Sequence, residues 1–207
     1  MKRKKNNSYV MSFTTGGLFR RGSLEAASLF LQKRSWDAVR KEIMDKNLLQ
    51  ARTVSTLHRE CREIVSRLQT LNDEELRFLV EADNREQGYM LWIAACRRYT
   101  FIGEFAVEVL RERYITLKVD VSKEEFDAFF NAKSEVHPEL FEISPTTRSK
   151  LRQVLFKILR ESELLTSDNT IIAAMPGAKL TNLLSRGKGR ELFFFPVFES
   201  DLKGMTH

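Results

Sequence analysis

Residues that interrupt regular structure are scarce in this chain, which has only four prolines and nine glycines among its 207 residues. Because both residue types break helices, their scarcity favours a protein built mainly from helices. Cysteine is scarcer still. The two that occur, Cys61 and Cys96, lie within apolar helical patterns. Buried free thiols in a reducing compartment explain this usage more simply than a disulfide does.

Long apolar runs are also missing. The longest, YMLWIAAC from Tyr89 to Cys96, ends at Arg97 and Arg98, whereas a membrane-spanning helix needs about 20 apolar residues. The first residues lack the apolar core of a secretory signal. The sequence therefore predicts a soluble, cytoplasmic protein without a membrane partner.

Residue patterns that carry catalysis or bind metals are absent as well. His58 lies on an amphipathic segment, His137 precedes a proline, His207 is terminal, and none of the three has a cysteine at zinc-ligand spacing. The stretch 14–17 (TTGG) lacks the spacing of a phosphate-binding loop and is predicted to be a turn. Acidic clusters stand at the starts of predicted helices, where they complement the helix dipole. We therefore expect no enzyme activity, cofactor, metal or small-molecule ligand.

Apolar side chains recur at helical spacing along the first half of the chain. The clearest case runs from Thr53 to Thr70, where apolar residues follow a 3-4-3-4 pattern and arginines gather on the opposite face. Shorter helices are predicted from Ser23 to Gln32, after the N-cap Ser35, and from Asp73 to Ala82. The segment from Tyr89 to about Tyr114 is apolar nearly all round, which is typical of the central helix of a bundle.

The second half has a different order of elements. The stretch YITLKVDVS at 114–122 is a strand or an extended linker. Ser122 caps a helix, and Ser144-Pro145 opens a second helix that ends near Leu165. Two strands are predicted next, TIIAAM at 170–175 and ELFFFPVF at 191–198, joined through a short helix and the basic loop GKGR. A helix, a turn, a basic helix and two strands in this order resemble a winged helix-turn-helix.

We thus predict a mainly α protein: a helical bundle with helix-turn-helix-like elements, plus a C-terminal winged-helix-like part with a small β-hairpin. Residues 1–11 are predicted to form a basic flexible tail, residues 12–116 an N-terminal helical domain, and residues 117–207 the winged-helix-like domain. The helix at 53–70 is either a second helix-turn-helix-like element or a plain bundle helix.

Positive charge is concentrated in blocks. The chain has 34 Lys and Arg against 28 Asp and Glu, a net charge of +6, which by itself favours a polyanionic partner only weakly. The first 24 residues hold six basic residues and no acid, and residues 144–160 hold five basic residues and no acid. The second block falls on the helix that would be the recognition helix. The alternative interpretation of its basic side is an ordinary solvated face.

The residue types on that helix suit nucleic acid. Lys and Arg can pair with phosphates, Gln153 can bond to an adenine edge, and Thr146 and Ser149 can bond to phosphate oxygens. Basic residues of the first block, of the helix at 53–70 and of the GKGR loop are further candidates. The predicted DNA-binding set is Thr146, Arg148, Ser149, Lys150, Gln153, Lys157, Arg160, Arg52, Arg59, Arg62, Arg20, Arg21, Lys188 and Arg190.

Four long stretches resemble the BrxA family, small accessory proteins of BREX bacteriophage-exclusion systems. They are SFTTGGLFRRGSLEAA, NLLQARTVSTLHRECREIVSRL, YMLWIAACRRYTFIGEFAVEVLRERY and TTRSKLRQVLFKILRESELL. The resemblance implies a mostly helical DNA-binding component of a bacterial defence locus, similar in overall shape to the helical antitermination factor NusB and with winged-helix-like parts. It also implies other BREX proteins as partners, since the locus encodes a methyltransferase, an ATPase and a phosphatase-like protein.

The leading hypothesis is therefore a non-enzymatic protein that binds double-stranded DNA mainly through phosphates, with weak or shape-directed sequence preference. A protein-interaction adaptor is the first alternative, with FFFPVF at 193–198 as its aromatic docking surface. RNA binding by a NusB-like fold is the second.

Overall fold

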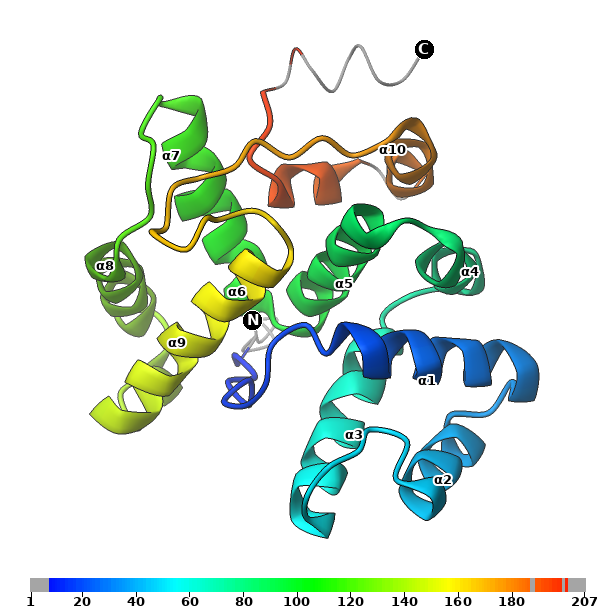
Figure 1. The fold of residues 1–207 in the computed structure, drawn as a ribbon. Helices are drawn as coiled ribbons and strands as arrows, with labels where there is room; N and C mark the ends of the chain where they lie inside the picture. The colour runs from blue at the N-terminus through cyan, green and yellow to red at the C-terminus, as the bar shows by residue number, and fades with distance from the viewer. Residues whose placement is uncertain (1–7, 187–188, 199, 201–207) are drawn as a thin grey trace, which may run out of the picture.

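The computed structural model describes residues 8–186, 189–198 and 200. Within these residues helices make up nearly all of the regular structure, which confirms the mainly α prediction (Figure 1). One contiguous cluster of buried apolar side chains runs through both halves of the chain. No helix in the described part combines the length and the apolar composition that crossing a membrane requires.

The first half of the chain begins with four helices: α1 (Arg20–Lys33), α2 (Trp36–Lys46), α3 (Val54–Leu68) and α4 (Asp73–Glu81). Local sequence sets where three of them begin. The side chains of Ser35, Thr53 and Asn72 cap α2, α3 and α4 by accepting hydrogen bonds from backbone N–H groups of the first turn. Asn72 and Glu75 form a complete capping box.

The central helix of the bundle is α5 (Asn84–Arg98), in which every residue from Gln87 to Cys96 is buried. The predicted helix does not continue unbroken to Tyr114, because the chain bends at Tyr99, whose backbone is extended (φ −121°, ψ 95°). The buried hydroxyl of Tyr99 donates a hydrogen bond to the Glu63 carboxylate of α3 at 2.6 Å, which holds the residue at this bend. The chain continues as α6 (Thr100–Phe105), the π-helical turn η1 (Ala106–Arg111) and α7 (Glu112–Ile115).

The second half contains the predicted helix pair, α8 (Lys123–Ser134) and α9 (Pro145–Glu161), joined through the short 3-10 turn η2 (Pro138–Leu140). Ser122 and Ser144 cap the two helices as predicted, and Pro145 occupies the first position of α9. Apolar side chains at helical spacing along α9 are buried, namely Leu151, Val154, Leu155 and Ile158, and so is Ser162 directly after the helix.

The predicted β-hairpin between 170–175 and 191–198 does not form. The second segment is instead the 3-10 helix η3 (Arg190–Phe194), which follows the short helix α10 (Ala178–Ser185). Burial explains the difference, because Phe195 and Val197 lie in the core and Trp92 Nε1 donates to the Phe194 carbonyl at 2.9 Å. The aromatic segment is therefore largely packed inside rather than displayed as a docking surface.

The first of the two predicted strands pairs with nearer neighbours. Ile171 forms an antiparallel bridge with Leu165, and Thr170 forms one with Asp120. These two bridges are the only β-pairing among the described residues. Leu165, Thr170 and Ile171 come shortly after α9, and Asp120 comes shortly before α8. In the stretch at 114–122, Tyr114 and Ile115 belong to α7, a turn follows at 116–117, and only Asp120 takes part in β-pairing.

Candidate nucleic-acid interface

The polar side of α9 is open to solvent. The apolar residues of α9 are buried, whereas five of its polar residues are exposed. The exposed residues are Thr146, Ser149, Lys150, Gln153 and Lys157. Lys150 Nζ donates to Gln153 Oε1 at 2.8 Å, and Lys157 Nζ lies 3.6 Å from a carboxylate oxygen of Glu161. We call this side the α9 strip. It presents two ammonium groups, one amide and two hydroxyls to solvent.

A bend of the N-terminal segment runs beside the α9 strip. Thr14 and the first two turns of α9 line a shallow hollow of about 740 Å³. Thr15 and Gly16 line a second hollow, of about 390 Å³, together with the middle of α9. Lys150 and Gln153 border both hollows. The threonines of the bend and the basic residues of α9 therefore share one continuous surface.

Two glycines allow the bend to pass close to α9. Gly16 has a φ of +76°, in the left-handed region that favours glycine, and a Cβ at Gly17 would come within 2.2 Å of Glu161 Oε2. That carboxylate accepts a hydrogen bond from the Leu18 N–H at 2.5 Å, and the Gly17 carbonyl accepts one from Arg67 Nη1 at 2.6 Å. The TTGG stretch is thus a turn that joins α9 to α3.

Arg67 belongs to a buried polar network. Its Nε donates to Glu63 Oε1 at 2.8 Å, and the Tyr99 hydroxyl donates to the same carboxylate. Burial and the Glu63 charge raise the pKa of Tyr99, so the phenol stays protonated and remains a donor. Through the bond from Arg67 to the Gly17 carbonyl, the network holds the bend at residues 14–17 against the N-terminal helices.

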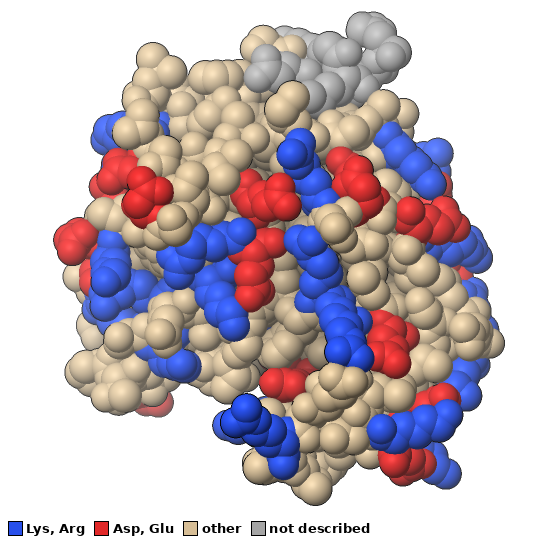
Figure 2. Space-filling model, viewed as in Figure 1, with Lys and Arg blue, Asp and Glu red and all other residues tan. Residues whose placement is uncertain are grey.

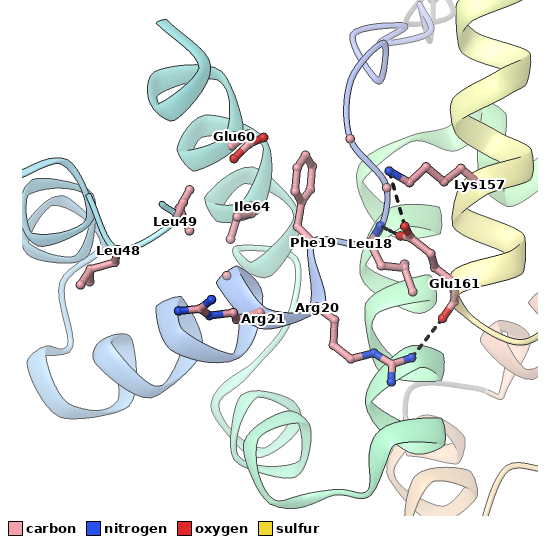
Figure 3. A pocket seen from close by; sticks show the side chains of 13 residues that line it. Leu18, Phe19, Arg20, Arg21, Leu48, Leu49, Glu60, Ile64, Lys157 and Glu161 are labelled. Atoms are coloured by element: carbon pink, nitrogen blue, oxygen red, sulfur yellow. Dashed lines mark hydrogen bonds and ion pairs between the residues drawn. The ribbon is translucent and has the colours of Figure 1, made fainter. Parts of the chain in front are cut away.

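A third hollow, of about 490 Å³, lies between α1, α3 and the end of α9 (Figure 3). Leu49 and Ile64 are among its apolar lining, and Lys157 and Glu161 line it from α9. Arg20, at the start of α1, reaches across to α9, where its Nη2 donates to the Glu161 carbonyl at 3.0 Å. Figure 2 shows an indentation between the two lower parts of the molecule, with Lys and Arg side chains on both sides.

Two of the predicted DNA-binding residues on α9, Arg148 and Arg160, bond to other residues of the protein. Arg148 Nε donates to Asp127 Oδ1 at 2.9 Å, and its guanidinium lies over the Phe130 ring at 4.4 Å from the centroid. Arg160 Nη1 donates to Asn169 Oδ1 at 3.0 Å, yet Arg160 is only half-buried and lines two of the hollows beside α9. Arg148 therefore positions α9 against α8, whereas Arg160 also remains accessible.

Three predicted arginines lie on α3 or just before it. Arg59 and Arg62 of α3 and Arg52, which precedes the helix, are exposed, but α3 lines the hollow of about 490 Å³ with Glu60 and Ile64. At about 100° per residue the arginine side of α3 points away from that hollow. None of the hollows that α9 lines includes these three arginines.

Two of the remaining candidates, Arg20 and Arg21, line the hollow of about 490 Å³ together with Lys157 of the α9 strip. Arg21 is exposed, and its Nη1 donates to Gln50 Oε1 at 2.9 Å. Arg190 is exposed at the start of η3, and Lys188 lies outside the described residues. Within the described part, no three His, Cys, Asp or Glu side chains gather as a metal site would require.

Sequence reasoning missed three residues beside the α9 strip, namely Lys123, Arg152 and Asn169. Together with α9 residues they line a hollow of about 480 Å³. Arg152 belongs to the basic block at 144–160 but projects between the predicted apolar and polar faces. Lys123 and Asn169 come from other segments, so no sequence pattern places them beside α9.

The fold and the site define a mainly helical protein with an exposed basic helix beside a fixed bend. A crystal structure of an uncharacterized protein from Magnetospirillum magneticum has a similar fold, with a TM-score of 0.79 and 19% sequence identity. The similarity covers 90% of this chain and 96% of that chain.

The BrxA family model matches residues 7–188, so the chain belongs to the BrxA family. The BREX protein BrxA of Escherichia coli O9:H4 (strain HS) is 25% identical over 159 residues, which are 77% of this chain and 75% of that protein. The BREX protein BrxA of Paramagnetospirillum magneticum is 24% identical over 144 residues, 70% of this chain and 72% of that protein. The family resemblance seen in the four sequence stretches is confirmed.

Proposed function

We propose that this protein is a non-enzymatic component of BREX phage defence that binds double-stranded DNA through the α9 strip. Its membership of the BrxA family supports the role in a BREX system. One observation carries the DNA-binding proposal: Lys150, Gln153 and Lys157 stay exposed along one side of α9 and are not covered by the N-terminal helices. Exposed ammonium groups on one helix face attract a polyanion.

The surroundings of α9 support this orientation. α8, the turn η2 and α9 follow one another in the order of a helix-turn-helix, and the bridge between Leu165 and Ile171 comes after α9, where a wing follows the recognition helix of a winged helix. The second bridge, from Thr170 to Asp120, ties this minimal wing to the residues before α8. In a winged-helix-like complex α9 lies along a groove and the wing lies beside the backbone.

The chemistry of the strip favours contacts to phosphates over contacts to bases. Lysine binds phosphate as a point charge, and the Gln153 amide oxygen is already an acceptor for Lys150. We therefore expect an affinity that changes little with DNA sequence and strongly with salt concentration.

The test is a fluorescence-anisotropy titration of a short DNA duplex with the wild-type protein and with Lys150→Ala/Lys157→Ala, at several salt concentrations. Loss of two phosphate contacts should weaken binding and reduce the slope of log K against log salt by about 1.8. The matched control is Lys41→Ala/Lys46→Ala, which removes the same charge from exposed positions on α2. The control should keep most of the wild-type slope.

The same titration on single-stranded RNA and single-stranded DNA separates the alternatives. Preference for RNA would favour an RNA-binding protein, and no binding to any polymer at low salt would favour a protein-interaction adaptor. An unchanged salt slope in Lys150→Ala/Lys157→Ala would remove the α9 strip from the interface.

A further inference from the structure

The hollow of about 480 Å³ lies between α9, the first turn of α8 and the turn that follows α9. Its polar lining includes Lys123, Ser149, Arg152, Arg160, Ser167 and Asn169. Three of these residues are cations, two carry hydroxyls and one carries an amide. None of the described residues that line the hollow is acidic. Figure 2 shows Lys and Arg side chains gathered over α8 and α9 on the visible face.

Backbone contacts hold the turn at 166–170 in place. The Thr166 N–H donates to the Thr170 carbonyl at 2.9 Å, and the Asn169 N–H donates to the Thr166 carbonyl at 3.1 Å. The Val121 N–H donates to the Asn169 carbonyl at 3.0 Å, which ties the turn to the residues just before α8. Three segments that are distant in sequence thus form the hollow before any ligand arrives, so binding does not have to order them.

Arg160 is directed at this turn. Its Nη1 donates to Asn169 Oδ1 at 3.0 Å, a contact that orients the guanidinium across the hollow. A guanidinium carries five N–H donors in a planar fork, so one contact uses only part of its capacity. The same fork geometry matches two oxygens of a phosphate group.

The nearest acids have partners of their own. Asp127 pairs with Arg152, so this arginine adds less than one full charge to the hollow. Asp168 accepts hydrogen bonds from neighbouring threonine hydroxyls, which lower the pKa of its carboxyl and hold it within the turn. Lys123 and Arg160 therefore supply most of the attraction for an anion.

We infer that this hollow is a binding site for a phosphate group, held chiefly by Lys123 and Arg160 with the hydroxyls of Ser149 and Ser167 as further donors. The inference rests on the proposed function, in which the phosphate belongs to the DNA backbone beside α9. The described lining combines cations with hydroxyl donors and contains no acid. Such a lining favours an oxyanion that accepts two hydrogen bonds over a cation or an apolar group.

The position of the hollow fits a backbone phosphate. Gln153 and Arg160 border both this hollow and the one beside Thr15 and Gly16, so the two hollows flank α9 along its length. A phosphate held at the flank next to the wing would fix the rotation of α9 about its own axis. The lysines of the α9 strip would then face the groove.

The test compares Lys123→Gln/Arg160→Gln with the wild-type protein in the duplex-DNA titration. Gln at position 160 can still donate to Asn169, which preserves the turn, and circular dichroism checks that the variant folds. We expect about tenfold weaker binding at low salt and a smaller salt slope, by about 1.8. The control, Lys41→Gln/Arg77→Gln, makes the same charge change at exposed positions on α2 and α4 and should bind nearly as wild type.

A second measurement uses inorganic phosphate as the probe and follows the backbone amide signals of Ser167 and Asn169 by NMR. Saturable shifts in the wild-type protein that disappear in Lys123→Gln/Arg160→Gln support the phosphate site. The inference is overturned if DNA affinity falls in Lys150→Ala/Lys157→Ala but not in Lys123→Gln/Arg160→Gln, a result that leaves the proposed function intact. Phosphate-induced shifts without any DNA binding would support the site for free phosphates and contradict the proposed function.

Discussion

Glu86 is a carboxylate on which burial and a hydrogen bond act in opposite directions. It lies half-buried in the first turn of α5, where its Oε1 accepts a hydrogen bond from the Gly177 N–H at 2.8 Å. Burial raises the pKa of Glu86, and this effect outweighs the lowering caused by the Gly177 hydrogen bond. The folded protein therefore binds the Glu86 proton more tightly than the unfolded chain does.

Replacement of Glu86 by Gln should raise the free energy of unfolding at neutral pH. The pKa of Glu86 is higher in the folded protein than in the unfolded chain. The stability that its protonated carboxyl contributes is therefore present below the unfolded-state pKa and is lost as the pH rises through the folded-state pKa. Gln keeps an acceptor for Gly177 and does not ionise. Urea denaturation across pH should show a stabilisation that is near zero in acid and grows toward neutrality. A stabilisation that shrinks with rising pH would contradict this account.

At the scale of elements, the position of α9 depends on α8. Asp127 of α8 accepts hydrogen bonds from Arg148 Nε at 2.9 Å and from Arg152 Nη1. The three side chains are 34%, 25% and 24% exposed, so solvent screens them only in part. Such a partly sheltered cluster stabilises more than a surface pair and less than a fully buried one. It also neutralises positive charge next to the proposed DNA-binding surface.

The variant Asp127→Asn should therefore have two effects of opposite sign. Stability should fall by about 1 kcal/mol, because the arginines lose a charged acceptor while Asn retains a neutral one. DNA affinity at low salt should rise roughly two- to fivefold, because the net positive charge beside α9 increases. Urea denaturation and anisotropy measure the two quantities.

A matched control separates local from global charge. Asp45→Asn makes the same charge change on the exposed side of α2 and should alter neither quantity appreciably. An equal rise in DNA affinity in both variants would show that only the net charge matters, and the placement of Asp127 would then be irrelevant to binding.

For the whole molecule, the two halves share one hydrophobic cluster and several polar contacts. Trp92 of α5 donates to the Phe194 carbonyl near the C-terminus, and Arg97 bonds to both Glu75 of α4 and Glu191 of η3. Burial acts to lower the pKa of Arg97, but its hydrogen bonds to the two carboxylates outweigh burial and raise it. Arg97 therefore stays charged and links α4 and α5 to η3.

We expect urea to unfold this protein in a single cooperative transition, because neither half has a separate core to retain. Tryptophan fluorescence reports the surroundings of Trp36 and Trp92, whereas far-ultraviolet circular dichroism reports helix content throughout the chain. The two midpoints should coincide. Separate midpoints would mean that part of the helical structure survives after the core around Trp92 has opened.

The sequence by itself determined the features that local physics controls. Ser35 and Ser122 were predicted as caps because a side-chain acceptor next to the first helical turn meets an unpaired N–H. The buried and exposed sides of α9 followed from a period of 3.6 residues, and the family followed from long matching stretches. These features depend on residues within a few positions of one another.

Only the tertiary structure decided the features that depend on distant residues. Glu63 holds the bend at Tyr99, the core takes in Phe195 where a strand was predicted, and Asp127 engages Arg148 while Lys150 stays open. The hollow of about 480 Å³ likewise joins residues from three separate segments. Burial and pairing between distant segments act only once the chain has folded. One basic residue of a block, Arg148, therefore becomes a structural support while another, Lys150, remains exposed.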